Sequence, residues 1–148
     1  MTKESLQFWH AELNKLFFNG ELEPAIIQCW EIPQEENEEL IEAQLVPITD
    51  PFIIQFYFDI ENEDFLYTIT VLLHEMVHQY CAEQGIEDIN SITDKHTRAF
   101  KKAAEEHGLM QGGYFLKEGA KSLIESRAET VKYTASLHSL VGRRSTWN

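Results

Sequence analysis

Residues 74–78 of the sequence carry the pattern H-E-x-x-H, formed by His74, Glu75 and His78. Histidines four residues apart project from the same face of an α-helix, so both imidazoles can reach one metal ion. Glu75 is offset by one residue, near enough to take a proton from an activated water without binding the metal itself. The spacing therefore predicts a zinc site that hydrolyses its substrate, with Glu75 as general base.

The sequence around this pattern supports ligation over an ordinary structural role for the histidines. Both lie among apolar residues, including Leu72, Leu73 and Val77. Imidazoles in such surroundings lose hydration with little compensation unless each finds a partner, and one metal ion would serve both. The competing interpretation is a pair of surface or hydrogen-bonded histidines.

A catalytic zinc ion usually takes three protein ligands, so a third ligand is expected. His96 follows a polar connection and can fold back over the first two histidines, whereas His107 lies eleven residues further on. Along a helix that separation is about 16 Å, so the two cannot bind one ion together. His96 is the predicted ligand, and His107 beside Gly108 is assigned to the C-terminal end of a helix.

Other ligand sets fit the sequence less well. Glu105 and Glu106 are carboxylate alternatives for the third ligand, as in a thermolysin-like arrangement. The metzincin pattern requires glycine and histidine at positions 81 and 84, where this chain has cysteine and glutamine. His10 and His138 have no ligand spacing and are predicted to be surface residues.

The elements that must position these residues indicate an α+β fold. Apolar residues recur at helical spacing over residues 3–18 and 64–84, and a second helix is predicted over 94–107. Segments 25–32 and 51–60 have strand composition, 42–46 is a further short candidate strand, and the acidic run 34–42 is predicted as a loop or short helix. A turn at Gly112 and Gly113 precedes a helix or helix pair over 117–140.

Length and composition predict one soluble domain over residues 1–148, with its core at about 6–109 and a C-terminal helical extension at about 114–141. No apolar segment is long enough to span a bilayer as a helix, and no signal peptide is recognisable, so a cytoplasmic location without membrane contact is expected. The two cysteines, Cys29 and Cys81, are predicted to be buried free thiols.

The charge distribution bears on possible partners. The net charge of −13 disfavours direct binding to nucleic acid, since phosphate contacts need clustered Lys and Arg. From residue 108 onward, however, six basic residues outnumber three acidic ones. This segment is either an ordinary solvated helix or a weakly basic region that contacts an acidic partner.

Three segments in this order resemble the SprT-like family of zinc metalloproteases, which includes Spartan. They are LNKLFFNGEL at 13–22, LLHEMVHQY at 72–80 and HTRAFK at 96–101. In the family pattern the third segment begins with a metal-binding histidine, followed by a glycine, so the resemblance implies His96 as ligand, with Thr97 in the glycine position. The chain has no cysteine after Cys81 and thus lacks the zinc ribbon of many members.

The resemblance implies a zincin-like domain with an N-terminal helix, a small twisted sheet, the H-E-x-x-H helix, a second ligand-bearing helix and the C-terminal extension. The expected function is zinc-dependent hydrolysis of a protein or peptide substrate. Segment 51–60 is either the edge strand that holds that substrate or a buried core strand, and Tyr80, Tyr114 or Tyr133 is the candidate donor to the oxyanion. The alternatives are a non-catalytic, zinc-stabilised protein-binding module and a Spartan-type protein that acts on DNA-bound proteins.

Overall fold

The computed structural model describes residues 1–30, 42–46 and 50–146, and the side chains of helix α4 only up to residue 132. Its elements combine helices with small sheets, so the α+β prediction is confirmed. The helices are α1 (Lys3–Phe17), α2 (Phe65–Gln84), α3 (Arg98–Glu106) and α4 (Glu118–Thr146), with a 3₁₀ turn η1 (Gln111–Gly113). The strands are β1 (Ala25–Cys29), β2 (Ala43–Val46), β3 (Phe52–Phe56), β4 (Leu109–Met110) and β5 (Phe115–Leu116).

The chain divides into two compact units, Met1–Leu116 and Lys117–Asn148. The first unit holds all the elements up to β5. The second consists of α4, so the described part of the predicted extension is one helix rather than a pair. Residues 31–41, which include most of the acidic run, lie outside the described part of the chain.

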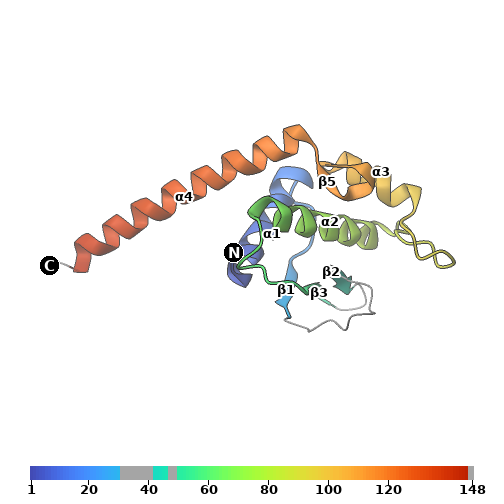
Figure 1. Cartoon of the computed structure of the whole chain (residues 1–148), viewed down its shortest axis with the longest axis horizontal. Coiled ribbons are helices and arrows are strands. Elements are labelled where there is room, and N and C mark those ends of the chain that lie inside the picture. Colours follow the sequence, from blue (N-terminus) through green and yellow to red (C-terminus); the bar gives the residue numbers. More distant parts are fainter. Residues whose placement is uncertain (31–41, 47–49, 147–148) are drawn as a thin grey trace. The chain divides into compact units, whose positions relative to one another are not determined.

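The larger sheet has the strand order β1-β3-β2, in which β1 is parallel to β3 and β2 is antiparallel to it. Helix α1 packs on β1 and α2 lies beside β2 (Figure 1). The segment predicted as an edge strand is therefore the central strand β3, and β2 is an edge. Ile54 and Phe56 of β3 are fully buried, as expected of the middle strand of a sheet whose outer strands pack on helices.

The opposite edge of the sheet is covered by one side chain. The amide of Gln7, on α1, donates to the carbonyl of Ala25 at 2.6 Å and accepts from the amide of Ile27 at 3.1 Å. These are the groups that a further strand would pair with. Gln7 therefore occupies the β1 edge.

Helix α2 is the centre of the first unit, as its sequence predicts. The apolar residues that it turns into the core are fully buried: Ile69, Leu72, Leu73, Met76 and Val77. Asp64 caps its N-terminus by accepting from the amide of Tyr67, and Gly85 ends it in the left-handed conformation at φ 69°. Both ends are set by local residues, so α2 starts and stops where the sequence indicates.

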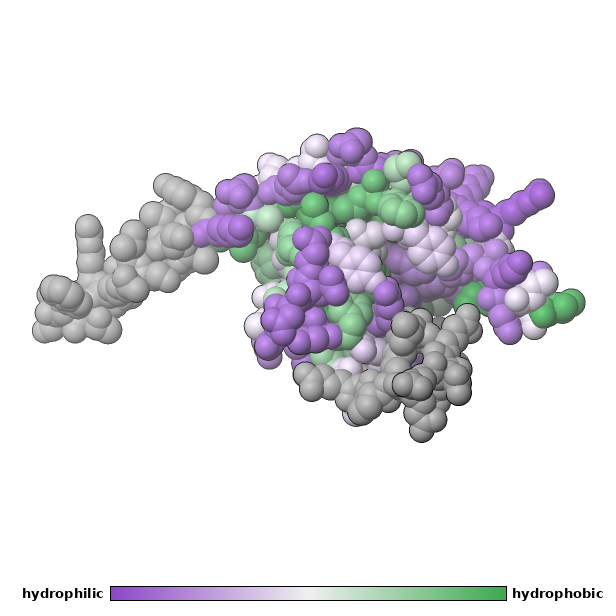
Figure 2. Space-filling model, viewed as in Figure 1, coloured by the Kyte–Doolittle hydropathy of each residue, from purple (hydrophilic) through white to green (hydrophobic). Residues whose placement is uncertain are grey.

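The cysteine prediction is right for Cys81, which is buried on α2, and wrong for Cys29, which is exposed at the end of β1. Among the described residues, no helix combines the length and the apolar character needed to cross a membrane. Hydrophilic residues predominate on the face drawn in Figure 2, in keeping with the net charge of −13.

Candidate metal centre

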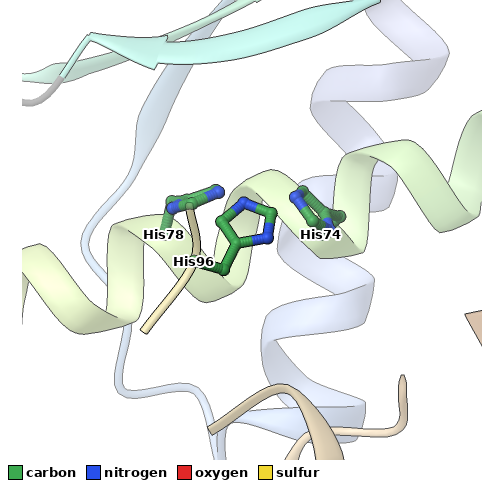
Figure 3. Close-up of side chains that lie close together, drawn as sticks. All are labelled: His74, His78 and His96. Carbon is green, nitrogen blue, oxygen red and sulfur yellow. The ribbon is translucent and has the colours of Figure 1, made fainter. Parts of the chain in front are cut away.

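The structure brings His74, His78 and His96 together. One ring nitrogen from each lies within 4.8 Å of those of the other two, and each pair of ring centroids is 5.1 Å apart. Figure 3 shows the three imidazoles converging, two from α2 and one from the loop that follows it. Three imidazole nitrogens at this separation are suited to hold one metal ion.

His107 and the two glutamates of α3 do not join this cluster. The Nδ1 atom of His107 lies 2.6 Å from the carbonyl oxygen of Phe17, and its ring stacks on Phe18 with the centroids 4.4 Å apart. It therefore binds the C-terminal end of α1. His107 is also the C-cap of α3, so the predicted position at the end of its own helix is confirmed.

His96 is not part of a helix, contrary to the prediction of a second ligand-bearing helix over 94–107. Helix α3 begins at Arg98, because Thr97 is its N-cap and accepts a hydrogen bond from the amide of Phe100 at 3.0 Å. His96 precedes the cap and forms an isolated antiparallel bridge with Ile89. Threonine at 97 has φ −75° and ψ 166°, so no glycine is needed at this turn.

Each of the three rings is held through its Nδ1 atom. Nδ1 of His74 lies 2.8 Å from the carbonyl oxygen of Gly113, and Nδ1 of His78 lies 2.7 Å from the carboxylate of Asp88. Nδ1 of His96 has a longer contact, 3.4 Å, with the hydroxyl of Tyr114. A ring that donates through Nδ1 keeps the lone pair on Nε2, so all three rings can offer Nε2 to an ion.

Phe100 packs against all three histidine rings. Its ring stacks on His96 and on His78, with the centroids 4.2 and 4.3 Å apart, and meets His74 edge-on at 5.2 Å. Phe100 is fully buried, so the three histidine rings rest on a residue of the core.

The surroundings keep the histidines neutral. Burial lowers the pKa of His74 to about 4, although its bond to Gly113 opposes the shift. Burial also lowers the pKa of His78, against the influence of Asp88, and that of His96. Neutral imidazole is the form that binds metals, so protons compete weakly with an ion at neutral pH.

Glu75 lies in the same cleft as the histidines and is 6% exposed. Burial raises its pKa to about 8, the carboxylate of Asp88 adds to the shift, and a hydrogen bond from the backbone of Leu45 opposes it. A cation on the adjacent histidines would favour the carboxylate form and lower this pKa toward neutrality. Such a value is the one required of a group that exchanges protons near pH 7.

The histidines and Glu75 open into a cleft of about 810 Å³. Strand β2 forms one wall with Ala43 and Leu45, and the loop after α2 forms the other with Asp88 and Ile89. Tyr114 also lines the cleft. A cleft of this size holds a ligand of several residues, so the cluster is accessible to an extended chain.

No sequence pattern predicts the roles of Asp88 and the carbonyl of Gly113, because both contact their histidines only through the tertiary fold. Of the remaining histidines, His10 was predicted at the surface, but it is 3% exposed and lies 2.9 Å from the side-chain oxygen of Gln79. The side chain of His138 lies outside the described residues.

Gly113 is a position where any side chain would disturb His74. It has φ +100°, and an added Cβ would lie 3.2 Å from Nδ1 of His74 and 3.3 Å from Phe100. We expect Gly113→Ala to lower the affinity for Co²⁺ by about 10- to 100-fold, the usual effect of disturbing a group that holds a metal ligand. Titration monitored by visible absorption measures this affinity.

Gly112 provides the matched control. It also has positive φ, +75°, but an added Cβ would have no atom nearer than 3.8 Å. Gly112→Ala therefore carries a similar backbone strain without touching His74, and it should keep nearly the wild-type affinity. Equal losses in the two variants would contradict the role assigned to Gly113.

Comparison of the chain with protein-family models, curated proteins and solved structures gave no match. The function must therefore be argued from the cleft and its residues.

Proposed function

We propose that this chain is a zinc-dependent metallopeptidase with a zincin-like domain, similar to the SprT-like family. The observation that carries the proposal is the convergence of His74, His78 and His96, each held through Nδ1, next to the buried Glu75 in one open cleft. A purely structural metal site has no need of a carboxylate placed for proton transfer. This arrangement favours hydrolysis over a binding role.

Zinc suits this set of donors. Three neutral imidazoles with an open side match the three-ligand sites in which zinc acts as a catalyst. When bound there, zinc polarises the substrate carbonyl and makes water a stronger nucleophile. The nitrogen donors would also accept other transition metals, so the metal content of the purified protein has to be measured.

Glu75 moves the proton in the proposed reaction. Its carboxylate takes a proton from the attacking water and delivers it to the leaving amine. The hydrogen bond from the backbone of Leu45 ties this carboxylate to β2 and fixes its direction. Asp88 keeps His78 in the tautomer that presents Nε2.

Strand β2 is the proposed guide for the substrate. Among the described strands it pairs only with β3, and Ala43 and Leu45 line the cleft. An extended peptide can add to such an edge through backbone hydrogen bonds, which are independent of sequence. This role was expected of residues 51–60, but β3 lies in the middle of the sheet and has no free edge.

The proposal predicts about one zinc per chain and hydrolysis of casein that depends on it. Elemental analysis measures the zinc, and release of labelled peptides measures hydrolysis. Treatment with 1,10-phenanthroline should stop the reaction, and added zinc should restore it. A chelated protein that fails to take up zinc again near neutral pH would refute the proposed function.

A further inference from the structure

Tyr114 covers the histidine cluster on the side of the cleft. Its ring stacks on His74 with the centroids 5.1 Å apart and the planes at 28°, and its centroid is 5.8 Å from that of His96. The residue lines the cleft but is 60% exposed. It is therefore next to the reacting atoms without being locked into the core.

The contact between Tyr114 and His96 leaves the phenolic proton available. If Nε2 of His96 serves an ion, the ring proton is on Nδ1 and is donated to the hydroxyl oxygen of Tyr114. The hydroxyl then still has its own proton to donate elsewhere. At 3.4 Å the contact is long, so it holds the hydroxyl loosely.

The turn that carries Tyr114 is anchored beside the histidine cluster. Gly112 and Gly113 precede it, both with positive φ. The carbonyl of Gly113 is bound to His74, which anchors the backbone immediately before Tyr114. The backbone is thus held beside His74, while the ring of Tyr114 lines the cleft and is accessible from it.

We infer that Tyr114 is a further catalytic residue, whose hydroxyl donates a hydrogen bond to the oxyanion formed during peptide hydrolysis. This inference rests on the proposed function and adds a residue to it. The geometry that carries it is the position of the Tyr114 ring over His74 and beside His96, at the open side of the cluster.

The step balances without any further reactant. Water oxygen forms a bond to the carbonyl carbon, the π electrons of the C=O bond move to its oxygen, and the proton of the water goes to Glu75. The hydroxyl of Tyr114 stabilises the negative oxygen and undergoes no covalent change. The C=O bond then re-forms, the C–N bond breaks, and Glu75 returns the proton to the amine.

Among the described tyrosines, Tyr80 and Tyr67 do not fit this role. Tyr80 packs against Phe18 and His107, with ring centroids 6.0 and 4.5 Å away, and does not line the cleft. The side chain of Tyr133 lies outside the described residues. Tyr67 lines the cleft, but its hydroxyl is hydrogen-bonded to Glu42.

The test uses two ligands of the zinc-loaded protein. One is a phosphinic analogue of acetyl-glycyl-glycine amide, whose tetrahedral phosphinate replaces the peptide bond and mimics the oxyanion. The other is mercaptoacetyl-glycine amide, which binds zinc through sulfur and presents no such oxygen. Tyr114→Phe is compared with wild type and with Tyr80→Phe, the same change outside the cleft.

Tyr114→Phe should weaken binding of the phosphinic analogue by about 10- to 100-fold, the effect of losing one hydrogen bond to a charged oxygen. Binding of the thiol and the zinc content should be unchanged, and casein hydrolysis should fall by about 10²-fold. Tyr80→Phe should match wild type in all four measurements.

The outcomes separate the two proposals. Unchanged phosphinate binding in Tyr114→Phe, an equal loss for both ligands, or a loss of zinc would overturn the inference and leave the proposed function standing. A zinc-loaded wild-type protein that binds neither ligand and hydrolyses no casein would overturn both.

Discussion

Replacing Glu75 with glutamine is expected to abolish casein hydrolysis while leaving zinc content and fold unchanged. The amide keeps the shape of the side chain but cannot accept a proton from the attacking water. Loss of a general base typically lowers the rate by about 10²- to 10⁴-fold. Because Glu75 is buried and no ligand atom is removed, the zinc content should remain at the wild-type value.

The same variant separates hydrolysis from binding. Equal hydrolysis by wild type and Glu75→Gln would contradict the assignment of Glu75 as the base. A wild-type protein that holds zinc but hydrolyses no casein would instead favour the zinc-stabilised binding module. Glu83→Gln is a suitable control because Glu83 lies on the same helix, at the end remote from His74, and does not line the cleft.

His96→Ala is expected to lose zinc as severely as His74→Ala. Each change removes one of the three proposed protein ligands. If the free energy of zinc binding is about 10 kcal/mol, the share of one ligand is about 3 kcal/mol. Its loss lowers the zinc affinity by roughly 10²-fold. Zinc affinity measured by competition with a chromophoric chelator should show the same large loss in both variants. This outcome would assign the third ligand to the loop before α3.

His107→Ala is the matched control and should keep its zinc. His107 binds the carbonyl of Phe17 and stacks on Phe18, so its loss leaves a part-buried carbonyl without the histidine. The expected effect is a destabilisation of about 1–3 kcal/mol, visible in thermal unfolding. If His107→Ala strips the zinc and His96→Ala retains it, the proposed ligand set is wrong.

The burial of Glu75 beside the histidines links its protonation to the binding of a metal ion. Burial disfavours the charged forms of Glu75, His74 and His78 alike. An ion bound by neutral histidines brings a positive charge beside a carboxyl group that burial holds in its protonated form, so Glu75 loses its proton more readily. Under the proposed function, binding of zinc and activation of Glu75 would be coupled through one local charge.

The H-E-x-x-H pair could be placed from the sequence because its geometry is local. Residues four apart share a helical face wherever the helix lies, and Asp64 and Gly85 mark its ends within the sequence. The predicted bounds 64–84 match α2 at Phe65–Gln84 for the same reason. The α+β class followed similarly from the spacing and composition of segments.

The sequence offers His96 and His107 as the third histidine of the site. The rise of a helix shows only that the two are too far apart to bind one ion together. The tertiary structure distinguishes them by position. The ring of His96 lies in the cluster with His74 and His78, and the ring of His107 lies against the carbonyl of Phe17. The loop position of His96 was missed because Thr97 was not recognised as the cap of α3.

Only the tertiary structure decided the strand order and the partners of the ligands. Pairing of β1 with β3 joins segments on either side of β2, and Gly113 meets His74 from 39 residues away. Such contacts depend on the path of the whole chain, since loop closure brings together residues that have no local relation. The sequence thus determined two of the three clustered histidines, His74 and His78. The fold selected His96 and supplied the groups that hold all three rings in place. The reason is that periodicity reports the direction of a side chain on its own helix and does not report which residues it contacts.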